Sequence, residues 1–276
     1  MSEPSLERLA QRHGSDKAEH GYCPFYEDLL ATRRPEPVRV LELGVGGFDR
    51  PDDPTWGGAS LRMWKDYFAH GTVWGLDILD KSGVAEDRVT VVRGGQADAD
   101  LLQRLSLQDG PFDLIVDDAS HMPSLTIASF EILFPLLAPG GVYVIEDVAT
   151  SYWPLWGGRL RPGSGRSTMG LVKARLDGLN HAEFKLPRYR PSALDRSIVE
   201  VRARHDIVAF VKGDNTAPST LNHPHPVGVV EWGRVDALPA AVSWARRPSV
   251  LRALDALGMR SWFQRARRRL VPRVDR

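Results

Sequence analysis

Two apolar runs in this sequence end in pairs of acidic residues. The run FDLIVDD ends in Asp117 and Asp118, and the run GVYVIED ends in Glu146 and Asp147. If the runs are neighbouring strands, at least three carboxylates meet at one edge of the sheet and repel each other unless a cation lies between them. Oxygen ligands without a cluster of Cys or His suit a hard cation, most simply Mg²⁺. We predict a Mg²⁺ site with Asp118, Glu146 and Asp147 as ligands. Asp117 is expected to contact the cofactor or to have a structural role.

His121 follows Asp118 by three residues and lies in the same predicted loop. An unperturbed histidine has a pKa of about 6.5, and nearby carboxylates would raise that pKa while a cation would lower it. A divalent cation also makes a nearby alcohol easier to deprotonate. His121 is therefore the candidate general base for activating a hydroxyl group. The competing interpretation is structural, with the histidine in the core and each acid capping a helix or pairing with an arginine.

A glycine-rich turn follows an earlier apolar run. LELGVGGF (41–48) places Glu42, Gly44, Gly46 and Gly47 where a strand turns toward a helix. Glycine lets the backbone approach a ligand closely, and the carboxyl ends of parallel strands are the usual cofactor position in such folds. The turn predicts a cofactor site, although a plain connection between elements would have the same composition.

Residues after the next two apolar runs fit a nucleoside cofactor. Asp77 can accept hydrogen bonds from both ribose hydroxyls, and Gln96 and Asp98 suit an adenine edge. A nicotinamide dinucleotide site would need G-x-G-x-x-G, but here the third glycine position is Asp49, and more acids follow in DRPDDP. Acids repel a pyrophosphate but not the sulfonium cation of S-adenosylmethionine. S-adenosylmethionine is therefore favoured as the cofactor. The alternative function is that of a nicotinamide-dependent oxidoreductase.

The apolar runs define the elements that must hold these residues. Strand-like runs at 38–44, 73–78, 89–94, 112–118 and 141–147 alternate with longer segments of helical spacing, such as 60–68 and 124–137. The alternation predicts an α/β fold with a doubly wound, Rossmann-like and mostly parallel sheet. The runs are almost wholly apolar, as expected for strands covered on both faces. A later run at 205–213 predicts an antiparallel pair at the edge of the sheet.

Composition limits the class of protein. The 276 residues are 42% hydrophobic and 26% charged, which is ordinary for a globular protein. Cys23 is the only cysteine, and the sequence shows no signal-peptide or membrane-spanning pattern, so we expect a cytoplasmic protein without disulfides. Residues 245–276 carry ten Arg against two Asp. Such a basic tail could contact an anionic membrane, nucleic acid or a second copy in a homo-oligomer, but a solvated end is commoner, and we expect no nucleic-acid partner.

Taken together, these motifs resemble those of the metal-dependent class I S-adenosylmethionine sugar O-methyltransferases of actinobacterial natural-product biosynthesis, which include mycinamicin and tetracenomycin rhamnosyl methyltransferases. The likeness covers roughly residues 8–213 and rests on HGSDKAEHGYCPFYEDLL, LELGVGG, WGLDILDKS, RGGQAD, DDASH, PGGVYVIED and DGLNHAE. It implies S-adenosylmethionine as donor, Mg²⁺ at the acids and His121 as base. The expected acceptor is a sugar hydroxyl of a glycosylated natural product or an oligosaccharide.

The expected organisation has three parts. Residues 1–37 would form a cap over the cofactor, 38–215 the methyltransferase domain, and 216–276 a C-terminal extension. The stretch 151–190, rich in Gly, Pro, Arg and aromatic residues, is typical of a substrate lid inside the domain. Some relatives carry an additional N-terminal domain, whereas only a short segment is expected before the cofactor domain here, so their acceptors are not carried over.

The resemblance also suggests contacts outside the core motifs. Ser15, Lys17 and Tyr22 or Tyr26 would touch the cofactor from the cap. The residues expected to face the substrate are Tyr152, Trp153, Asp177, Asn180 and His181, with Trp156 as a further lid aromatic. A non-catalytic module that only holds a nucleoside is the remaining rival, and it leaves the clustered acids without a purpose.

Overall fold

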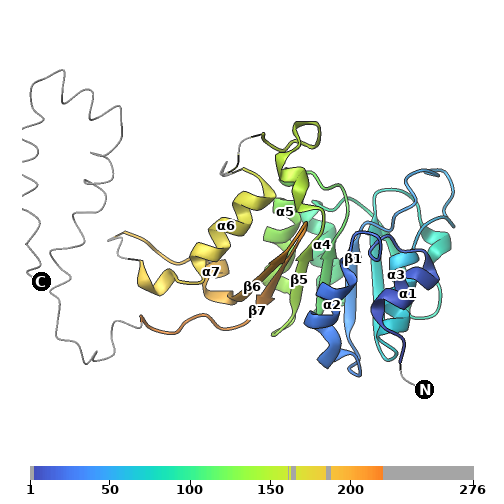
Figure 1. Ribbon diagram of the computed structural model, residues 1–276, viewed down its shortest axis with the longest axis horizontal. Coiled ribbons are helices and arrows are strands. Elements are labelled where there is room, and N and C mark those ends of the chain that lie inside the picture. The colour runs from blue at the N-terminus through green and yellow to red at the C-terminus, as the bar shows by residue number, and fades with distance from the viewer. Residues whose placement is uncertain (1–2, 161, 163–165, 185–187, 220–276) are drawn as a thin grey trace, which may run out of the picture. The chain divides into compact units, whose positions relative to one another are not determined.

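Seven strands form one sheet in the part of the chain that the computed structural model describes, residues 3–160, 162, 166–184 and 188–219 (Figure 1). The strand order is β3-β2-β1-β4-β5-β7-β6. β1 to β5 are parallel, while β7 runs antiparallel to both β5 and β6. The strands are β1 Arg39–Leu43, β2 Thr72–Asp77, β3 Val89–Arg93, β4 Leu114–Asp117, β5 Val142–Ile145, β6 Ile198–Arg204 and β7 Ile207–Lys212. The predicted doubly wound, mostly parallel α/β fold is confirmed.

Helices cover both faces of this sheet, which explains why the runs of the parallel strands are mostly apolar. On one face, side chains such as Val40 and Val116 join a core with α1 Leu6–His13, α2 Cys23–Leu30 and α3 Ala59–Tyr67 (Figure 1). On the other face, Leu41 and Ile115 join a core with α4 Ala99–Gln108, α5 Pro123–Leu133 and α6 Thr168–Gly178. The remaining elements are α7 Ala193–Ser197 and 3₁₀ turns η1 Ala31–Arg33, η2 Ser82–Val84, η3 Phe134–Leu136, η4 Val148–Tyr152, η5 Pro154–Trp156 and η6 His181–Glu183.

The antiparallel pair differs in detail from the prediction at 205–213. That run supplies only β7, which lies inside the sheet between β5 and β6. The edge strand β6 begins at Ile198, within a stretch whose composition indicates loops. β7 buries its first four side chains, whereas β6 buries Ile198 and exposes most of its second half. An edge strand rich in charged residues therefore gives little hydrophobic signal.

A shared acid ties the N-terminal helices together. Glu27 in α2 accepts hydrogen bonds from the Leu6 amide of α1, at 2.5 Å, and from the Tyr67 hydroxyl of α3, at 3.0 Å. Ser5 caps the start of α1, and Gly14 ends it in the left-handed region at φ 72°. Because α1 stops at this glycine, the residues that follow can turn over the edge where the parallel strands end.

Two expectations concern segments beyond this sheet. The basic tail at 245–276 and nearly all of the C-terminal extension lie outside the described residues. Among the residues that are described, no helix has the length and hydropathy needed to cross a bilayer.

Candidate active site

A cavity of about 630 Å³ opens at the carboxyl ends of the parallel strands. Its wall is formed by the turn after β1, the end of β2 and the loops after β3 and β4, and the segment after α1 closes one side. α/β folds bind their cofactors at this position. The predicted cofactor residues that line the cavity are Ser15, Gly44, Gly46, Gly47, Asp77, Gln96 and Asp98.

The turn after β1 requires glycine at specific positions. Gly44 has φ 93°, and a Cβ there would lie 2.2 Å from the Asp118 carbonyl oxygen. Gly47 has φ 74°, and a Cβ would lie 2.5 Å from the Trp56 carbonyl oxygen. A side chain at either position would meet backbone atoms that cannot swing away. The absence of a Cβ at Gly44 thus lets the β1 turn and the loop after β4 touch.

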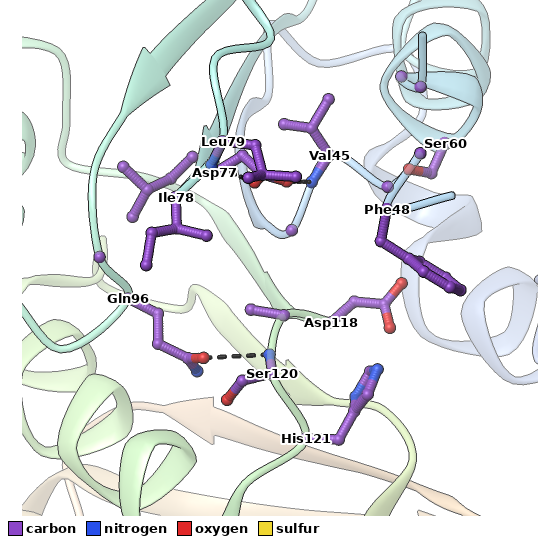
Figure 2. Close-up of a pocket in the computed structure, with 18 of the residues that line it drawn as sticks. Val45, Phe48, Ser60, Asp77, Ile78, Leu79, Gln96, Asp118, Ser120 and His121 are labelled. Carbon is purple, nitrogen blue, oxygen red and sulfur yellow. Dashed lines mark hydrogen bonds between the residues drawn. The ribbon is translucent and has the colours of Figure 1, made fainter. Parts of the chain in front are cut away.

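Asp77 is held at the cavity wall by two backbone amides. Its Oδ2 accepts a hydrogen bond from the Val45 amide at 2.9 Å, and its Oδ1 accepts one from the Leu79 amide at 2.8 Å (Figure 2). Each carboxylate oxygen keeps a free lone pair, since an oxygen can accept more than one hydrogen bond. The side chain is fixed in orientation and can still receive a diol.

Asp117 lies behind the cavity and helps to fix the loop that carries His121. It is buried and accepts hydrogen bonds from Ser129 at 2.5 Å, Tyr143 at 2.9 Å and Gln96 at 3.2 Å. Burial raises the pKa of Asp117 to about 6, and these hydroxyl donors oppose the rise. The Gln96 Oε1 accepts from the Ser120 amide at 3.0 Å (Figure 2). Gln96 therefore links the buried acid to the residue before His121, and its side chain is already used within the protein.

Three predicted residues converge at the cavity wall. Asp118, His121 and Asp147 each offer one ligand atom, and these atoms lie within 4.8 Å of one another. His121 Nε2 is 3.5 Å from Asp147 Oδ2, and Tyr22 donates a hydrogen bond of 2.6 Å to Asp147 Oδ1. Figure 2 shows the Asp118 carboxylate and the His121 ring reaching into the same part of the cavity. The residues most suited to metal and base chemistry are thus neighbours.

Glu146 is placed differently from the other two predicted metal ligands. It is buried away from the cavity, where both carboxylate oxygens lie 2.9 Å from Lys17 Nζ and Oε1 accepts a short hydrogen bond from Tyr26. Lys17 also lies 2.9 Å from Asp118 Oδ2 and 3.1 Å from Glu42 Oε1. The prediction expected a metal to separate these acids, whereas here a lysine ammonium does so.

Four residues predicted to contact the cofactor lie outside the cavity wall. Lys17, Tyr26, Glu42 and Asp117 do not line the cavity; they are buried beneath it or behind it. Burial opposes the charge on Lys17, but the attraction of Asp118, Glu146 and Glu42 outweighs this effect and holds the pKa of Lys17 well above its ordinary value. Asp98, which does line the cavity, caps α4 by accepting from the Leu101 amide at 3.1 Å.

The predicted substrate residues fall into two groups. Tyr152 and Trp153 lie on the surface of the segment after β5, and the nearby Trp156 ring centroid is 5.8 Å from that of His121. In the second group, Asp177 lies in the last turn of α6, and Asn180 and His181 follow that helix. His181 Nε2 lies 2.7 Å from the Asn215 carbonyl oxygen, beyond the end of β7 and hence at the sheet edge opposite the cavity. The structure does not bring this second group to the site.

Some residues of the site carry no clear sequence signal. Phe48 follows the glycine turn, lines the cavity and is 87% exposed (Figure 2). Asp206, in the turn between β6 and β7, accepts from the Ala149 amide at 2.5 Å and so braces the segment after Asp147. A large apolar residue next to a glycine turn is the one pattern that could have drawn attention to Phe48.

The sheet order, the antiparallel β7–β6 pair and the cavity at the strand ends define a class I methyltransferase fold. A solved structure of the methyltransferase MycE from the mycinamycin biosynthetic pathway, in complex with Mg, SAH and mycinamycin VI, matches with a TM-score of 0.74 at 40% identity. The match covers 81% of this chain and 57% of that one. Another crystal form of MycE with Mg and SAH gives a TM-score of 0.77 at 38% identity, over 86% of this chain and 60% of the other.

The chain is homologous to the macrolide and tetracenomycin sugar O-methyltransferases, which confirms the resemblance in its motifs. It is 42% identical over 216 residues to mycinamicin VI 2''-O-methyltransferase of Micromonospora griseorubida, covering 77% of this chain and 53% of the relative. It is 44% identical over 211 residues to 8-demethyl-8-alpha-L-rhamnosyl tetracenomycin-C 2'-O-methyltransferase of Streptomyces olivaceus, covering 76% and 54%. The chain thus spans about half the length of the curated relatives it matches. No protein-family model matches it.

Proposed function

We propose that the chain transfers a methyl group from S-adenosylmethionine to a sugar hydroxyl of a glycosylated natural product or oligosaccharide, with Mg²⁺ as cofactor. The observation that carries this proposal is the meeting of Asp118, His121 and Asp147 at the wall of a cofactor-sized cavity beside the glycine turn. The homology supports the same chemistry, since MycE was crystallised with Mg and SAH and the curated relatives are sugar O-methyltransferases.

The donor would bind along the glycine turn. Asp77, held by two amides, accepts the ribose hydroxyls, and the glycine turn, which lines the cavity, offers its backbone to the amino-acid part of the donor. The positive sulfonium then faces a wall that carries the carboxylates of Asp118 and Asp147. A pyrophosphate in the same place would meet those negative charges, which disfavours the nicotinamide alternative.

Asp118 and Asp147 fit a hard cation, because both offer carboxylate oxygens close together at the cavity wall. Glu146 is not free to join them in the arrangement seen here, because Lys17 and Tyr26 use its oxygens. When bound, Mg²⁺ would make the acceptor hydroxyl more acidic.

His121 is the proposed general base. It takes the proton from the sugar hydroxyl while the oxygen bonds to the donor methyl carbon and the carbon–sulfur bond breaks, so that the sulfonium becomes the neutral thioether of S-adenosylhomocysteine. The carboxylate of Asp147, 3.5 Å from Nε2, stabilises the imidazolium that results. The Gln96 contact to the Ser120 amide keeps the histidine loop in place. Most of the work of the chain is the positioning of these groups.

The acceptor side of the site has an apolar surface next to His121. We call the exposed residues Trp153, Leu155, Trp156 and Leu160 the lid surface. Leu155 is 95% exposed, and the Trp156 ring lies beside the His121 ring. Large apolar groups gathered at one place on a surface commonly mark a binding site. A glycoside could place its sugar at His121 and an apolar aglycone against the lid surface.

Replacing Leu155 with serine should raise the KM for a glycosylated macrolide acceptor about tenfold, because one buried leucine contact is worth roughly 1.5–3 kcal/mol. The KM for S-adenosylmethionine should stay unchanged. Leu107→Ser is the matched control, because Leu107 on α4 is 79% exposed and does not line the cavity. Equal acceptor KM values for the two variants would remove the lid surface from the acceptor site.

The proposed function is tested by a tritiated-methyl transfer screen over rhamnosyl and other glycosides, with Mg²⁺ or with a chelator. We expect transfer that stops on chelation and returns when Mg²⁺ is added. Tight binding of a nicotinamide dinucleotide without affinity for S-adenosylhomocysteine would instead favour an oxidoreductase. Donor affinity without methyl transfer to any glycoside would favour a nucleoside-binding module.

A further inference from the structure

Lys17 occupies an unusual position for a lysine. Its side chain is fully buried, and its ammonium lies within 3.1 Å of carboxylates from three places in the sheet. Glu42 belongs to β1, Asp118 follows β4 and Glu146 follows β5. A buried lysine is costly unless it is paired, and here it is paired three times. The contacts therefore hold together the ends of three neighbouring strands.

The lysine and the cavity share one acid. Lys17 contacts Asp118 through Oδ2, whereas the Asp118 side chain is still partly exposed and lines the cavity. The Lys17 ammonium thus lies on the buried side of Asp118, and a ligand in the cavity would lie on the opposite side of this carboxylate. The residues just before the lysine, Gly14 to Asp16, line the same cavity. The segment that closes the cavity and the charge that balances its acids are therefore continuous in the chain.

The acids at this edge outnumber the ammonium group that faces them. Four carboxylates, those of Glu42, Asp118, Glu146 and Asp147, lie at this edge, and one ammonium faces three of them. One ammonium balances at most one of these carboxylates, and a divalent cation would add positive charge at Asp118 and Asp147. Without the lysine, the metal-free protein would hold the acids together against their full mutual repulsion.

We propose that Lys17 is a built-in cation that keeps the acidic edge assembled in the metal-free protein and weakens its affinity for divalent cations. This inference rests on the proposed function only in assuming that the edge binds a metal. Lys17 is a positioning residue: it touches neither the cavity nor a reacting atom, and it acts through Asp118 and Glu146.

The test replaces Lys17 with methionine, an unbranched side chain that is one atom shorter and carries no charge. In chelator, the unfolding midpoint should fall well below that of the parent chain. Adding MgCl₂ should raise the midpoint of the variant by more than that of the parent, because the additional negative charge should tighten Mg²⁺ binding about tenfold or more, and binding to the folded state stabilises it. NaCl at matched ionic strength controls for screening.

Lys81→Met is the matched control. Lys81 is also fully buried, but within the described part of the chain its ammonium donates to backbone carbonyl oxygens, those of Gly47, Trp56 and Asp53, at 2.9 to 3.5 Å. The Lys81→Met variant should have a lower unfolding midpoint than the parent chain. Its midpoint should rise with Mg²⁺ by no more than that of the parent. A larger Mg²⁺ response in Lys17→Met than in both the parent and Lys81→Met is a result that a purely structural lysine would not give.

The outcomes separate this inference from the proposed function. If the parent chain shows no Mg²⁺ binding in calorimetry, the metal part of the proposed function fails and this inference fails with it. If the parent binds and Lys17→Met binds equally or more weakly, only the inference is overturned. If Lys17→Met does not fold even with Mg²⁺, the double variant Lys17→Met/Glu146→Gln decides, because removing one acid with the lysine should restore folding in chelator. A double variant that also fails to fold overturns the inference.

Discussion

Replacing His121 with alanine should lower kcat for methyl transfer at least about 100-fold, as expected for the loss of a general base. The affinity for S-adenosylhomocysteine should change little, because the groups that would hold the donor come mainly from the β1 turn and Asp77, on other strands. The histidine side chain lies partly exposed at the cavity wall, so its removal should not disturb the core. Single-turnover rates and calorimetry with S-adenosylhomocysteine measure the two effects separately.

His70→Ala is the matched control for this experiment. His70 is exposed after α3 and does not line the cavity, so its replacement should leave kcat unchanged. Normal turnover in His121→Ala would show that another group takes the proton. Loss of both turnover and donor affinity would assign His121 a structural role, because a base acts on the acceptor and not on donor binding.

The sequence could predict the sheet because its signal is local. Runs such as LIVD in β4 and VYVI in β5 are buried at every position and mostly apolar, since helices cover both faces. The order in which acidic residues follow the strands then predicts that Asp118 and Asp147 meet, because β4 and β5 are adjacent and parallel. Edge strand β6 (IVEVRAR) was missed because it alternates apolar and charged residues and is largely exposed, unlike the mostly apolar runs that indicated the other strands.

The direction of a side chain was harder to predict than its place on the sheet. Glu42 lies within β1 and Asp118 follows the neighbouring strand β4, but Glu42 points into the face covered by α3, where Trp64 donates to it at 3.1 Å. Glu146 and Asp147 are consecutive, yet Glu146 turns inward to Lys17 while Asp147, in the left-handed region at φ 51°, turns to the cavity. The backbone conformation after a strand decides which of two adjacent acids faces the ligand, and no residue type specifies it.

The lysine illustrates a second reason why sequence reasoning fell short. Lys17 lies 101 residues from Asp118 and 129 from Glu146, so their contact depends on the whole sheet being assembled. From sequence, three acids without a counter-charge indicate a metal, since no local residue neutralises them. The structure supplies a lysine from the N-terminal segment. The two explanations are compatible, because one ammonium leaves negative charge at the edge.

Replacing Gly44 with alanine should be the most damaging change of a single methyl group at the site. The residue has φ 93°, which costs an alanine about 1–2 kcal/mol. The new Cβ would also lie 2.2 Å from the Asp118 carbonyl oxygen, so the β1 turn and the loop after β4 must separate, at roughly 1–3 kcal/mol more. We expect the free energy of unfolding to fall by about 2–5 kcal/mol in urea titrations, and S-adenosylhomocysteine affinity to fall at least about tenfold.

Gly140→Ala separates the clash from the backbone conformation. Gly140 has φ 73°, and a Cβ there would meet nothing within 4 Å. It lies in the turn before β5, at the sheet edge opposite the cavity, so its replacement should cost only the conformational part and leave donor affinity unchanged. Equal destabilisation by the two variants would mean that the loop after β4 yields to a side chain at no cost. In that case, something other than the contact between Gly44 and Asp118 would hold Asp118 and His121 beside the donor.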